Sequence, residues 1–321
     1  MSDDNQPSKW QQTITGEWHG YPSVFEPDGT HVGVNKVTRA SVFEDGKTTY
    51  WMDTNFDATG PLANRFECGR FEFGVIDSDK DRIYTGPDFI GSGKPYGMCV
   101  DSKYFSPGWN TQLRTVNHIV PELAIQVYSS QLFEGDTLIA LFNGIYINTQ
   151  DHETNPETQA LVSDFLEKEK RIGKKPFVLP QKNAGVWSGE MEVYDAKQNL
   201  LGHNQVRIEY TPITLLRARM DVKITGVIER EFSFERSRYE NHHQFHGPDC
   251  YGNGIAYGRF LYGLQHFFGE AVKLKTRDVL IDDKYCLCLL WQFYESDIET
   301  HTTFGVLDWE EGENVLKAVY L

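Results

Sequence analysis

The chain has 321 residues, 40% of them apolar and 13% aromatic, which is enough for two domains with buried cores. Its formal net charge of -15 disfavours binding to nucleic-acid phosphates or to anionic membrane surfaces, so we expect neither partner. The start of the chain lacks a signal-peptide pattern, and no apolar run approaches the ~20 residues of a membrane-spanning helix. The five cysteines form no Cys-x-x-Cys pair, which favours a reducing, cytoplasmic setting.

The chain carries the same motifs twice, in the same order. GEWHG at positions 16–20 returns as GVWSG at 185–189. GPDFIGSGKPYG at positions 86–97 returns as GPDCYGNGIAYG at 247–258, with Gly, Pro, Asp and Tyr matching in place. The same register, continued without a gap, places LRTVNHIV (113–120) on LKTRDVLI (274–281) and QLFEGD (131–136) on QFYESD (292–297). Such agreement indicates that one domain has been duplicated.

Within each copy the residue pattern is that of β-strands. In RARMDVKI (217–224), apolar side chains alternate with charged ones, which predicts a strand with one buried and one exposed face. The stretches EPDG, EDGK, EGD and EEGE are typical of turns between neighbouring strands. Because the copies show no long helical pattern, we expect an antiparallel sheet that closes on itself.

A helix is predicted between the copies. Asn155 can cap it, Pro156 suits its first position, and Leu161 and Phe165 form an apolar stripe that ends before Gly173. The predicted fold is therefore all-β, with two tandem antiparallel β-barrels joined by one helix. We expect the first barrel at residues 8–150, the helix and linker at 151–182, and the second barrel at 183–321.

The two upstream motifs carry a family resemblance. Gly16 and Trp18, and again Gly185 and Trp187, are similar to the Gly-x-Trp signature of lipocalins, or calycins. The chain thus resembles tandem lipocalin-like proteins, which include bacterial carotenoid hydratases, fungal cyclases of the Diels–Alder type and uncharacterised two-barrel proteins of cyanobacteria. The resemblance implies up-and-down barrels in which each tryptophan plugs the closed end.

The repeated glycine-rich loop offers candidate site residues. Asp88 and Tyr96 in the first copy, and Asp249 and Tyr257 in the second, have two interpretations. In the first, the aspartates form Asx turns with backbone amides just downstream, and the loop only shapes the barrel rim. In the second, the loop lies at a ligand mouth and offers these side chains to a polar headgroup.

The second repeated block adds an amide to each copy. Gln131 shares a strand face with Val127, Ser129 and Phe133, and Gln292 shares one with Tyr294. If these faces point inward, each amide needs a partner in an apolar wall. A ligand carbonyl or hydroxyl is one candidate, and a neighbouring strand is the other. The candidate ligand-binding residues are therefore Gln131, Gln292, Tyr96, Asp88, Tyr294 and the aromatic neighbour Trp291.

Three histidines gather just before the second glycine-rich loop, at positions 242, 243 and 246. A metal site is chemically conceivable there, but the first copy has Asp81, Arg82 and Thr85 at these positions, so we expect no metal and no cofactor. Exposed loop histidines are one interpretation. In the other, His246 acts as a general acid or base beside Asp249, with Tyr257 nearby.

Three functions remain open at this point. The first is binding of a small apolar or amphipathic molecule inside a barrel. The second is a cofactor-free isomerase, cyclase or hydratase that acts on a terpenoid, polyketide or carotenoid-like substrate. The third is an interaction protein whose barrels are solid. Small residues mixed with aromatic ones in the strands favour a cavity, and the histidines favour the second barrel as the working one.

Overall fold

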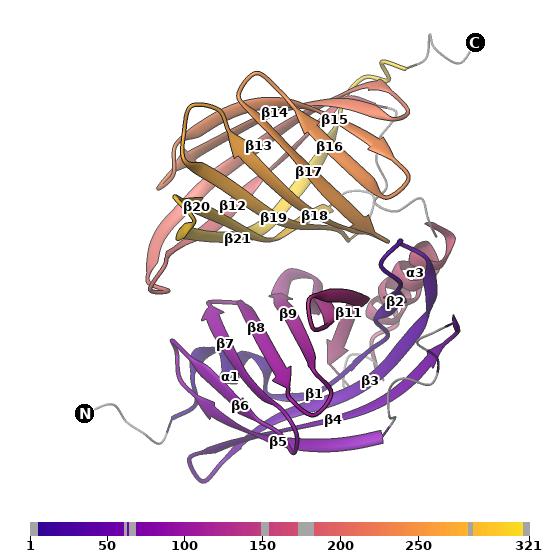
Figure 1. Cartoon of the computed structure of the whole chain (residues 1–321), viewed down its shortest axis with the longest axis vertical. Coiled ribbons are helices and arrows are strands. Elements are labelled where there is room, and N and C mark those ends of the chain that lie inside the picture. The colour runs from indigo at the N-terminus through magenta and orange to yellow at the C-terminus, as the bar shows by residue number, and fades with distance from the viewer. Residues whose placement is uncertain are drawn as a thin grey trace. The chain divides into compact units, whose positions relative to one another are not determined.

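The computed structural model describes residues 6–60, 63, 69–148, 154–172, 183–281 and 285–316. The chain divides into two compact units, Met1–Arg171 and Ile172–Leu321 (Figure 1). Each unit closes antiparallel strands into a barrel, so the predicted all-β tandem architecture is confirmed. The predicted linker after the helix, residues 173–182, lies outside the described residues.

The first unit begins with a short helix and continues as strands. Its elements are α1 (Lys9–Ile14), β1 (Gly16–Gly20), β2 (Ser23–Phe25), β3 (His31–Glu44), β4 (Lys47–Ala58), β5 (Gly69–Asp77), β6 (Arg82–Thr85), β7 (Ile90–Tyr96), β8 (Cys99–Ser106), β9 (Thr111–Val120), the 3-10 turn η2 (Pro121–Leu123), β10 (Ile125–Glu134) and β11 (Thr137–Asn148). Neighbouring strands pair in chain order, and β1 and β2 each pair with both β3 and β11. These double pairings close the ring.

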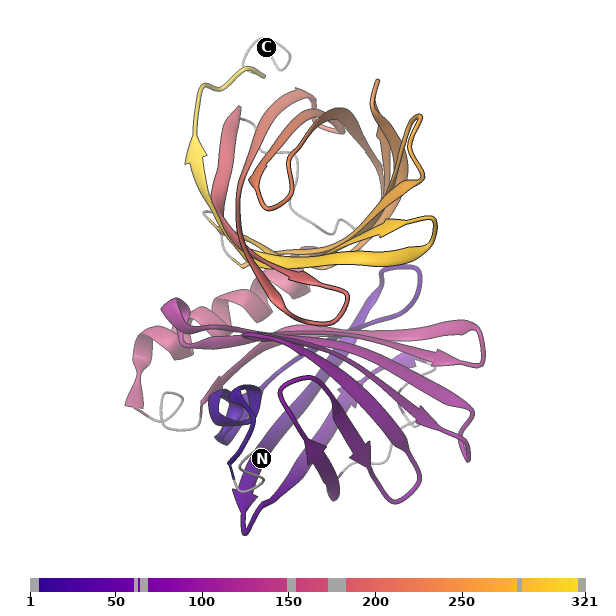
Figure 2. The same ribbon diagram turned by 90° about the vertical axis from the view of Figure 1, so that its left-hand side faces the viewer.

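The second unit is a closed barrel of ten described strands. They are β12 (Gly185–Asp195), β13 (Leu200–Thr214), β14 (Arg217–Gly226), β15 (Arg230–Tyr239), β16 (His242–His246), β17 (Cys250–Tyr257), β18 (Phe260–Phe267), β19 (Val272–Leu280), β20 (Tyr285–Glu295) and β21 (Ile298–Glu311). Each strand pairs with the next, and β21 returns to β12. Figure 2 looks into this ring.

The strands and turns follow the residue pattern. In β14 the apolar residues at even positions from Ala218 to Ile224 are buried, and the charged residues between them are more exposed. The predicted EDGK turn joins β3 to β4 and places Asp45 and Gly46 at φ 50° and 73°. Left-handed residues at both central positions match the twist of the strands in a tight hairpin.

The duplication is visible in matching local structure. The loop between β6 and β7 is closed by a hydrogen bond from Gly86 N to Phe89 O of 3.0 Å, and the loop between β16 and β17 by one from Gly247 N to Cys250 O of 2.9 Å. Trp18 and Trp187 are both buried on the first strand of their barrel. These features recur at the matching positions that the repeated motifs predict.

The predicted helix is α3 (Pro156–Ile172), which follows the first barrel in the chain. Its cap is confirmed, because Asn155 Oδ1 accepts from the backbone N of Glu157 at 3.0 Å and of Thr158 at 3.3 Å. Phe165 is buried, as the apolar stripe predicts.

The interiors of the two barrels differ. Buried apolar residues of the second barrel form one continuous cluster that includes side chains from Trp187 to Leu307. The described apolar residues of the first barrel form smaller separate clusters around Val24, Trp10, Tyr50 and Trp18. The described apolar side chains of the first barrel therefore do not form one continuous core.

Candidate ligand-binding cavity in the first barrel

A cavity of about 350 Å³ lies inside the first barrel. Its apolar wall includes Phe56, Phe71, Phe73, Phe89, Leu113 and Phe142. Small-molecule sites in proteins are typically apolar hollows of about 300–1,000 Å³ with a few polar groups, so this cavity has the size of a modest ligand.

Helix α1 closes one end of the cavity. Trp10 and Ile14 both line it, and they pack against Val100 and Ile119 on the inner face of β8 and β9. The loop between β6 and β7 belongs to the opposite end, where Phe89 contributes to the wall. The cavity therefore runs from the helix toward the glycine-rich loop that the sequence singled out.

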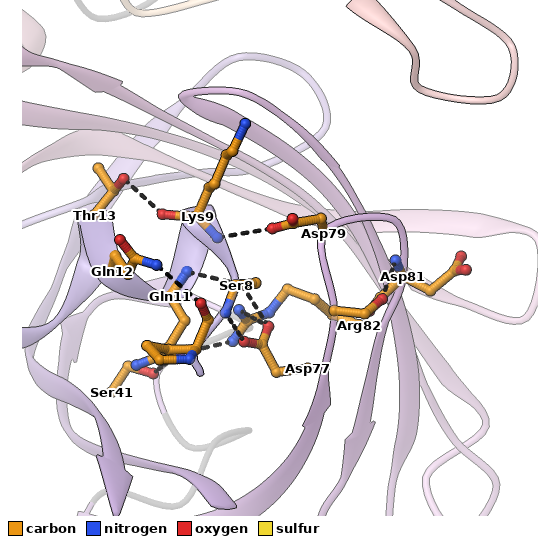
Figure 3. A network of polar contacts seen from close by, with 12 residues as sticks. Ser8, Lys9, Gln11, Gln12, Thr13, Ser41, Asp77, Asp79, Asp81 and Arg82 are labelled. Atoms are coloured by element: carbon orange, nitrogen blue, oxygen red, sulfur yellow. Dashed lines mark hydrogen bonds and ion pairs between the residues drawn. The ribbon is translucent and has the colours of Figure 1, made fainter. Parts of the chain in front are cut away.

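A polar network ties α1 to the barrel (Figure 3). Ser8 caps the helix and also donates from Oγ to Asp77 Oδ1 at 2.8 Å, while its backbone N donates to Asp77 Oδ2 at 2.9 Å. Lys9 N donates to Asp79 at 2.8 Å. These bonds fix the helix on the ends of β5 and the following turn.

Arg82 is the buried cation of this network. Its Nη1 forms an ion pair of 2.5 Å with Asp77, and its Nη2 donates to Gln11 Oε1 at 3.3 Å. Gln11 Oε1 also accepts from Ser41 Oγ at 2.7 Å. Because Asp77 neutralises Arg82, this corner of the cavity carries no net charge.

Arg39 is a second buried cation on the cavity wall, and its surroundings differ from those of Arg82. Its Nη1 donates to the Tyr50 hydroxyl at 2.6 Å, its Nη2 donates to Gln126 Oε1, and its guanidinium lies 4.4 Å from the centre of the Tyr146 ring. Gln126 in turn donates to Asn117 Oδ1 at 3.2 Å. No carboxylate among the described residues is paired with Arg39.

The neighbouring phenols do not supply the missing negative charge. Burial raises the pKa of Tyr50, Tyr128 and Tyr146, so all three stay protonated near neutral pH. Burial by itself lowers the pKa of Arg39, but the surrounding phenols and the bond to Tyr50 more than offset it, and that pKa lies above its ordinary value. Arg39 is therefore a charged group inside a neutral, largely aromatic cavity.

The two hollows recorded at described residues of the second barrel are unlike this cavity. A hollow of about 10 Å³ lies near His243, Arg236 and Tyr210. A larger depression of about 530 Å³ is bordered by exposed charged side chains such as Arg207, Glu209 and Lys223, which places it on the outer surface. The histidines had favoured the second barrel as the working one, whereas the cavity with an aromatic wall belongs to the first.

The condition on which a ligand role for Gln131 and Gln292 depended, an inward-pointing strand face, is not met. Tyr128 and Leu132 line the cavity, so Gln131 lies on the other face of β10. Trp291 and Phe293 belong to the core of the second barrel, so Gln292 also faces outward, where its Nε2 donates to Glu299 Oε2 at 3.4 Å. The interpretation as a structural hydrogen bond fits Gln292.

The two aromatic neighbours of Gln292 are placed differently. Trp291 points into the second barrel, and its indole N donates to Asp278 Oδ1 at 2.7 Å within the packed core. Tyr294 follows a β-bulge and is half-buried. Neither belongs to the cavity of the first barrel, and their predicted ligand contacts stay predictions.

The aspartates of the glycine-rich loops do not form the expected Asx turns. Asp88 accepts from Ser106 Oγ at 3.3 Å, and Ser106 lines the cavity. Asp249 accepts from the backbone N of Ser233 at 3.0 Å. Each aspartate thus bonds a neighbouring strand rather than its own turn, and Asp88 lies at the edge of the cavity.

The candidate catalytic residues do not converge. His246 is exposed on β16, and within the described part of the chain no hydrogen bond or ion pair joins it to Asp249. Tyr257 is buried at the end of β17, and Tyr96 is buried at the end of β7. Neither tyrosine lines the cavity. An acid–base role for His246, Asp249 and Tyr257 therefore stays a prediction without geometric support.

The histidine stretch is a strand in which the side chains alternate. His242 and His246 are exposed, while His243 is buried and shares a face with the core residue Phe245. Across the described residues, no three His, Cys, Asp or Glu side chains lie together as a metal ion would need. None of the described helices is long and apolar enough to span a membrane.

Sequence reasoning missed Arg39, although a signal was present. The register that places GEWHG on GVWSG aligns Val37 with Val206, and it also aligns Arg39 with Ile208. Ile208 is buried in the core of the second barrel, so a charged residue in the first copy replaces a core residue in the second. Trp10, Ile14 and Arg82 were missed because only the folded chain brings α1 against the barrel.

No family model and no curated protein matches this chain. Among solved structures, a protein of unknown function of the DUF3598 family from the cyanobacterium Nostoc punctiforme matches 95% of this chain and 100% of its own, with 12% identity and a TM-score of 0.59. A putative outer membrane protein of Bacteroides fragilis, with 7% identity, matches 94% of this chain and 100% of its own. A Rhodopseudomonas blastica porin, with 8% identity, matches 92% and 98%. Their TM-scores of 0.23 and 0.19 are too low to carry an argument. The chain thus shares its tandem two-barrel fold with the cyanobacterial protein, and its relation to carotenoid enzymes stays a prediction.

Proposed function

We propose that this protein binds a small amphipathic molecule inside its first barrel. The observation that carries the proposal is the cavity of about 350 Å³, which has an aromatic wall and a buried polar cluster around Arg39. Apolar cavities that remain open inside a folded core cost stability, and a guest with matching apolar surface regains the lost contacts. A protein that keeps such a space is suited to hold a ligand.

The composition of the wall supports binding over acid–base conversion. The described lining residues include arginines, tyrosines, threonines, two asparagines and a serine among the apolar side chains, but no Asp, Glu, His, Lys or Cys. A general base near neutral pH would come from those groups. We therefore place the enzymatic alternative second. A cytoplasmic location is part of the proposal, in keeping with Cys99 and Cys250, which are buried free thiols.

The proposal is tested by blocking the cavity. Leu113 lines it, whereas its neighbour Gln112 lies on the outer face of β9. We expect calorimetric titration with decanol to show saturable binding with a negative heat-capacity change, because apolar surface is buried. Leu113→Trp should abolish this binding by filling the space, and Gln112→Trp should leave it intact. Equal binding by both variants would overturn the proposal.

A further inference from the structure

Among the described residues, the cavity of the first barrel has one positive charge without an acidic partner. Of the two arginines on the cavity wall, Arg82 is paired with Asp77, while Arg39 has no acidic partner among the described residues. Arg39 is only 8% exposed. Burying a cation without an anion is costly, and hydrogen bonds with a tyrosine ring contact return only part of that cost.

The guanidinium also has unused hydrogen-bond donors. It carries five N–H groups, two on each terminal nitrogen and one on Nε. Nη1 forms one bond, to Tyr50, and Nη2 forms one bond, to Gln126, so each terminal nitrogen keeps a second N–H. Nε is buried and has no partner in the described part of the chain. A planar group with two oxygens can accept from both terminal nitrogens at once.

The apolar wall continues away from this charge. Met52 and Phe56 follow Tyr50 on the inward face of β4, and Phe71 pairs with Met52 on the neighbouring strand. Leu113 lines the cavity near the start of β9. A ligand with its head at Arg39 would thus place its apolar part against aromatic and aliphatic side chains.

We infer that the molecule bound in the first barrel is a monoanionic amphiphile whose carboxylate pairs with Arg39. This inference rests on the proposed function of the cavity. One negative charge neutralises the cavity, because Arg82 and Asp77 already cancel each other. The planar guanidinium fork matches a carboxylate in shape. The hydrogen bond from Nη1 to the Tyr50 hydroxyl helps to fix the orientation of the guanidinium.

The test compares ligands of equal length and different charge. We expect calorimetry to show that wild-type protein binds decanoate more tightly than decanol and more tightly than decylamine. The Arg39→Met variant keeps the length of the side chain but removes its charge. It should bind decanoate about 10- to 100-fold more weakly, since hydrogen bonds to a charged group contribute that much, while its affinity for decanol stays within about 2-fold.

Two further variants make the test specific. Arg114→Met is the matched control, because Arg114 is exposed on the outer face of β9 and the change is the same. Its affinity for both ligands should match wild type. Arg39→Lys keeps the charge but loses the fork, and should fall between wild type and Arg39→Met. Should Arg39→Met fail to fold, Arg39→Lys and the wild-type preference for decanoate over decanol decide the matter.

The outcomes separate the two proposals. If decanol and decanoate bind wild type equally, and Arg39→Met changes neither, the cavity binds ligand but the inferred carboxylate site is wrong. If neither ligand binds, the proposed function itself fails. Retained decanol binding with a selective loss of decanoate in Arg39→Met supports both.

Discussion

The two barrels arose from one sequence unit, yet their described interiors differ, because a cavity of about 350 Å³ lies in the first and a continuous apolar cluster fills the second. Three inward positions show the difference. In the first barrel these positions hold the charged Arg39 and its two neighbours Tyr50 and Tyr146. The matching positions of the second barrel hold Ile208, Met220 and Leu307. At these three positions, polar side chains of the first barrel must satisfy their hydrogen bonds, whereas the aliphatic side chains of the second pack into its continuous core.

A second difference between the two copies lies at the α1 end of the first barrel. Arg82, which forms the ion pair with Asp77, corresponds to His243 in the second barrel. Burial lowers the pKa of His243 to about 2, and nearby arginines contribute to the same shift, so this side chain is neutral. At this position the side chain is thus charged in the first barrel and neutral in the second, although the second barrel also buries an arginine, Arg236.

Exchanging the charged and apolar residues should give the largest effect. Ile208→Arg introduces an unpaired cation into a packed core, so we expect a loss of about 5 kcal/mol or more in the stability of the second barrel. Arg39→Ile removes a cation that has no acidic partner among the described residues, and its lost hydrogen bonds should cost less than about 2 kcal/mol. Hydrogen exchange measured by mass spectrometry reports on each barrel separately. Equal losses of stability in the two variants would contradict the predicted difference between the barrels.

Truncation of an equivalent aromatic residue should give the next largest effect. Phe234 belongs to the packed core, and Phe73, the matching residue of the first copy, borders the cavity. We expect Phe234→Ala to cost about 3–5 kcal/mol. Phe73→Ala should cost less, because one side of the ring already lacks packed neighbours. Hydrogen exchange followed by mass spectrometry measures the loss of stability in both variants. A larger loss for Phe73→Ala would mean that the cavity is filled in solution.

The opposite change, enlargement of a leucine that occupies the same position in both barrels, should give a smaller effect. Leu113 lines the cavity, and Leu274 is buried in the second core. Leu274→Trp should destabilise its barrel by about 1–3 kcal/mol through overpacking. Leu113→Trp has space to occupy, so we expect a change near zero or a gain. Thermal unfolding of the two variants, with Gln112→Trp as a surface control, makes the comparison.

The barrels should behave alike toward acid. Burial lowers the pKa of His118 in the first barrel to about 3 and that of His243 in the second to about 2, against 6.5 in an unfolded chain. Between these values the unfolded chain binds a proton that the folded chain does not, so stability falls as pH drops below about 6.5. The slope reaches about 1.4 kcal/mol per pH unit for each histidine.

Replacing one histidine at a time tests this linkage. His118→Gln should flatten the pH dependence of the first barrel alone, and His243→Gln that of the second. Denaturant unfolding at several pH values, followed by hydrogen exchange, assigns each slope to its barrel. An unchanged slope in either variant would show that its histidine is accessible to protons in the folded state.

The sequence by itself was sufficient for the architecture. Alternation in Arg217–Ile224, the turn at Asp45 and the cap at Asn155 are local patterns, and each produced the predicted element. The duplicated motifs established that the fold occurs twice. Local patterns determine such features because backbone conformation and side-chain alternation depend on residues close in the chain.

The tertiary structure decided where the site lies. Strand alternation shows that Gln131 and its neighbours share a face but not whether that face points inward, and here it points outward. The cavity depends on residues far apart in the chain, from Trp10 to Phe142, whose side chains meet only after the barrel closes. Whether a barrel is hollow or solid is a balance of packing among all its inward residues, and no single motif reports that balance.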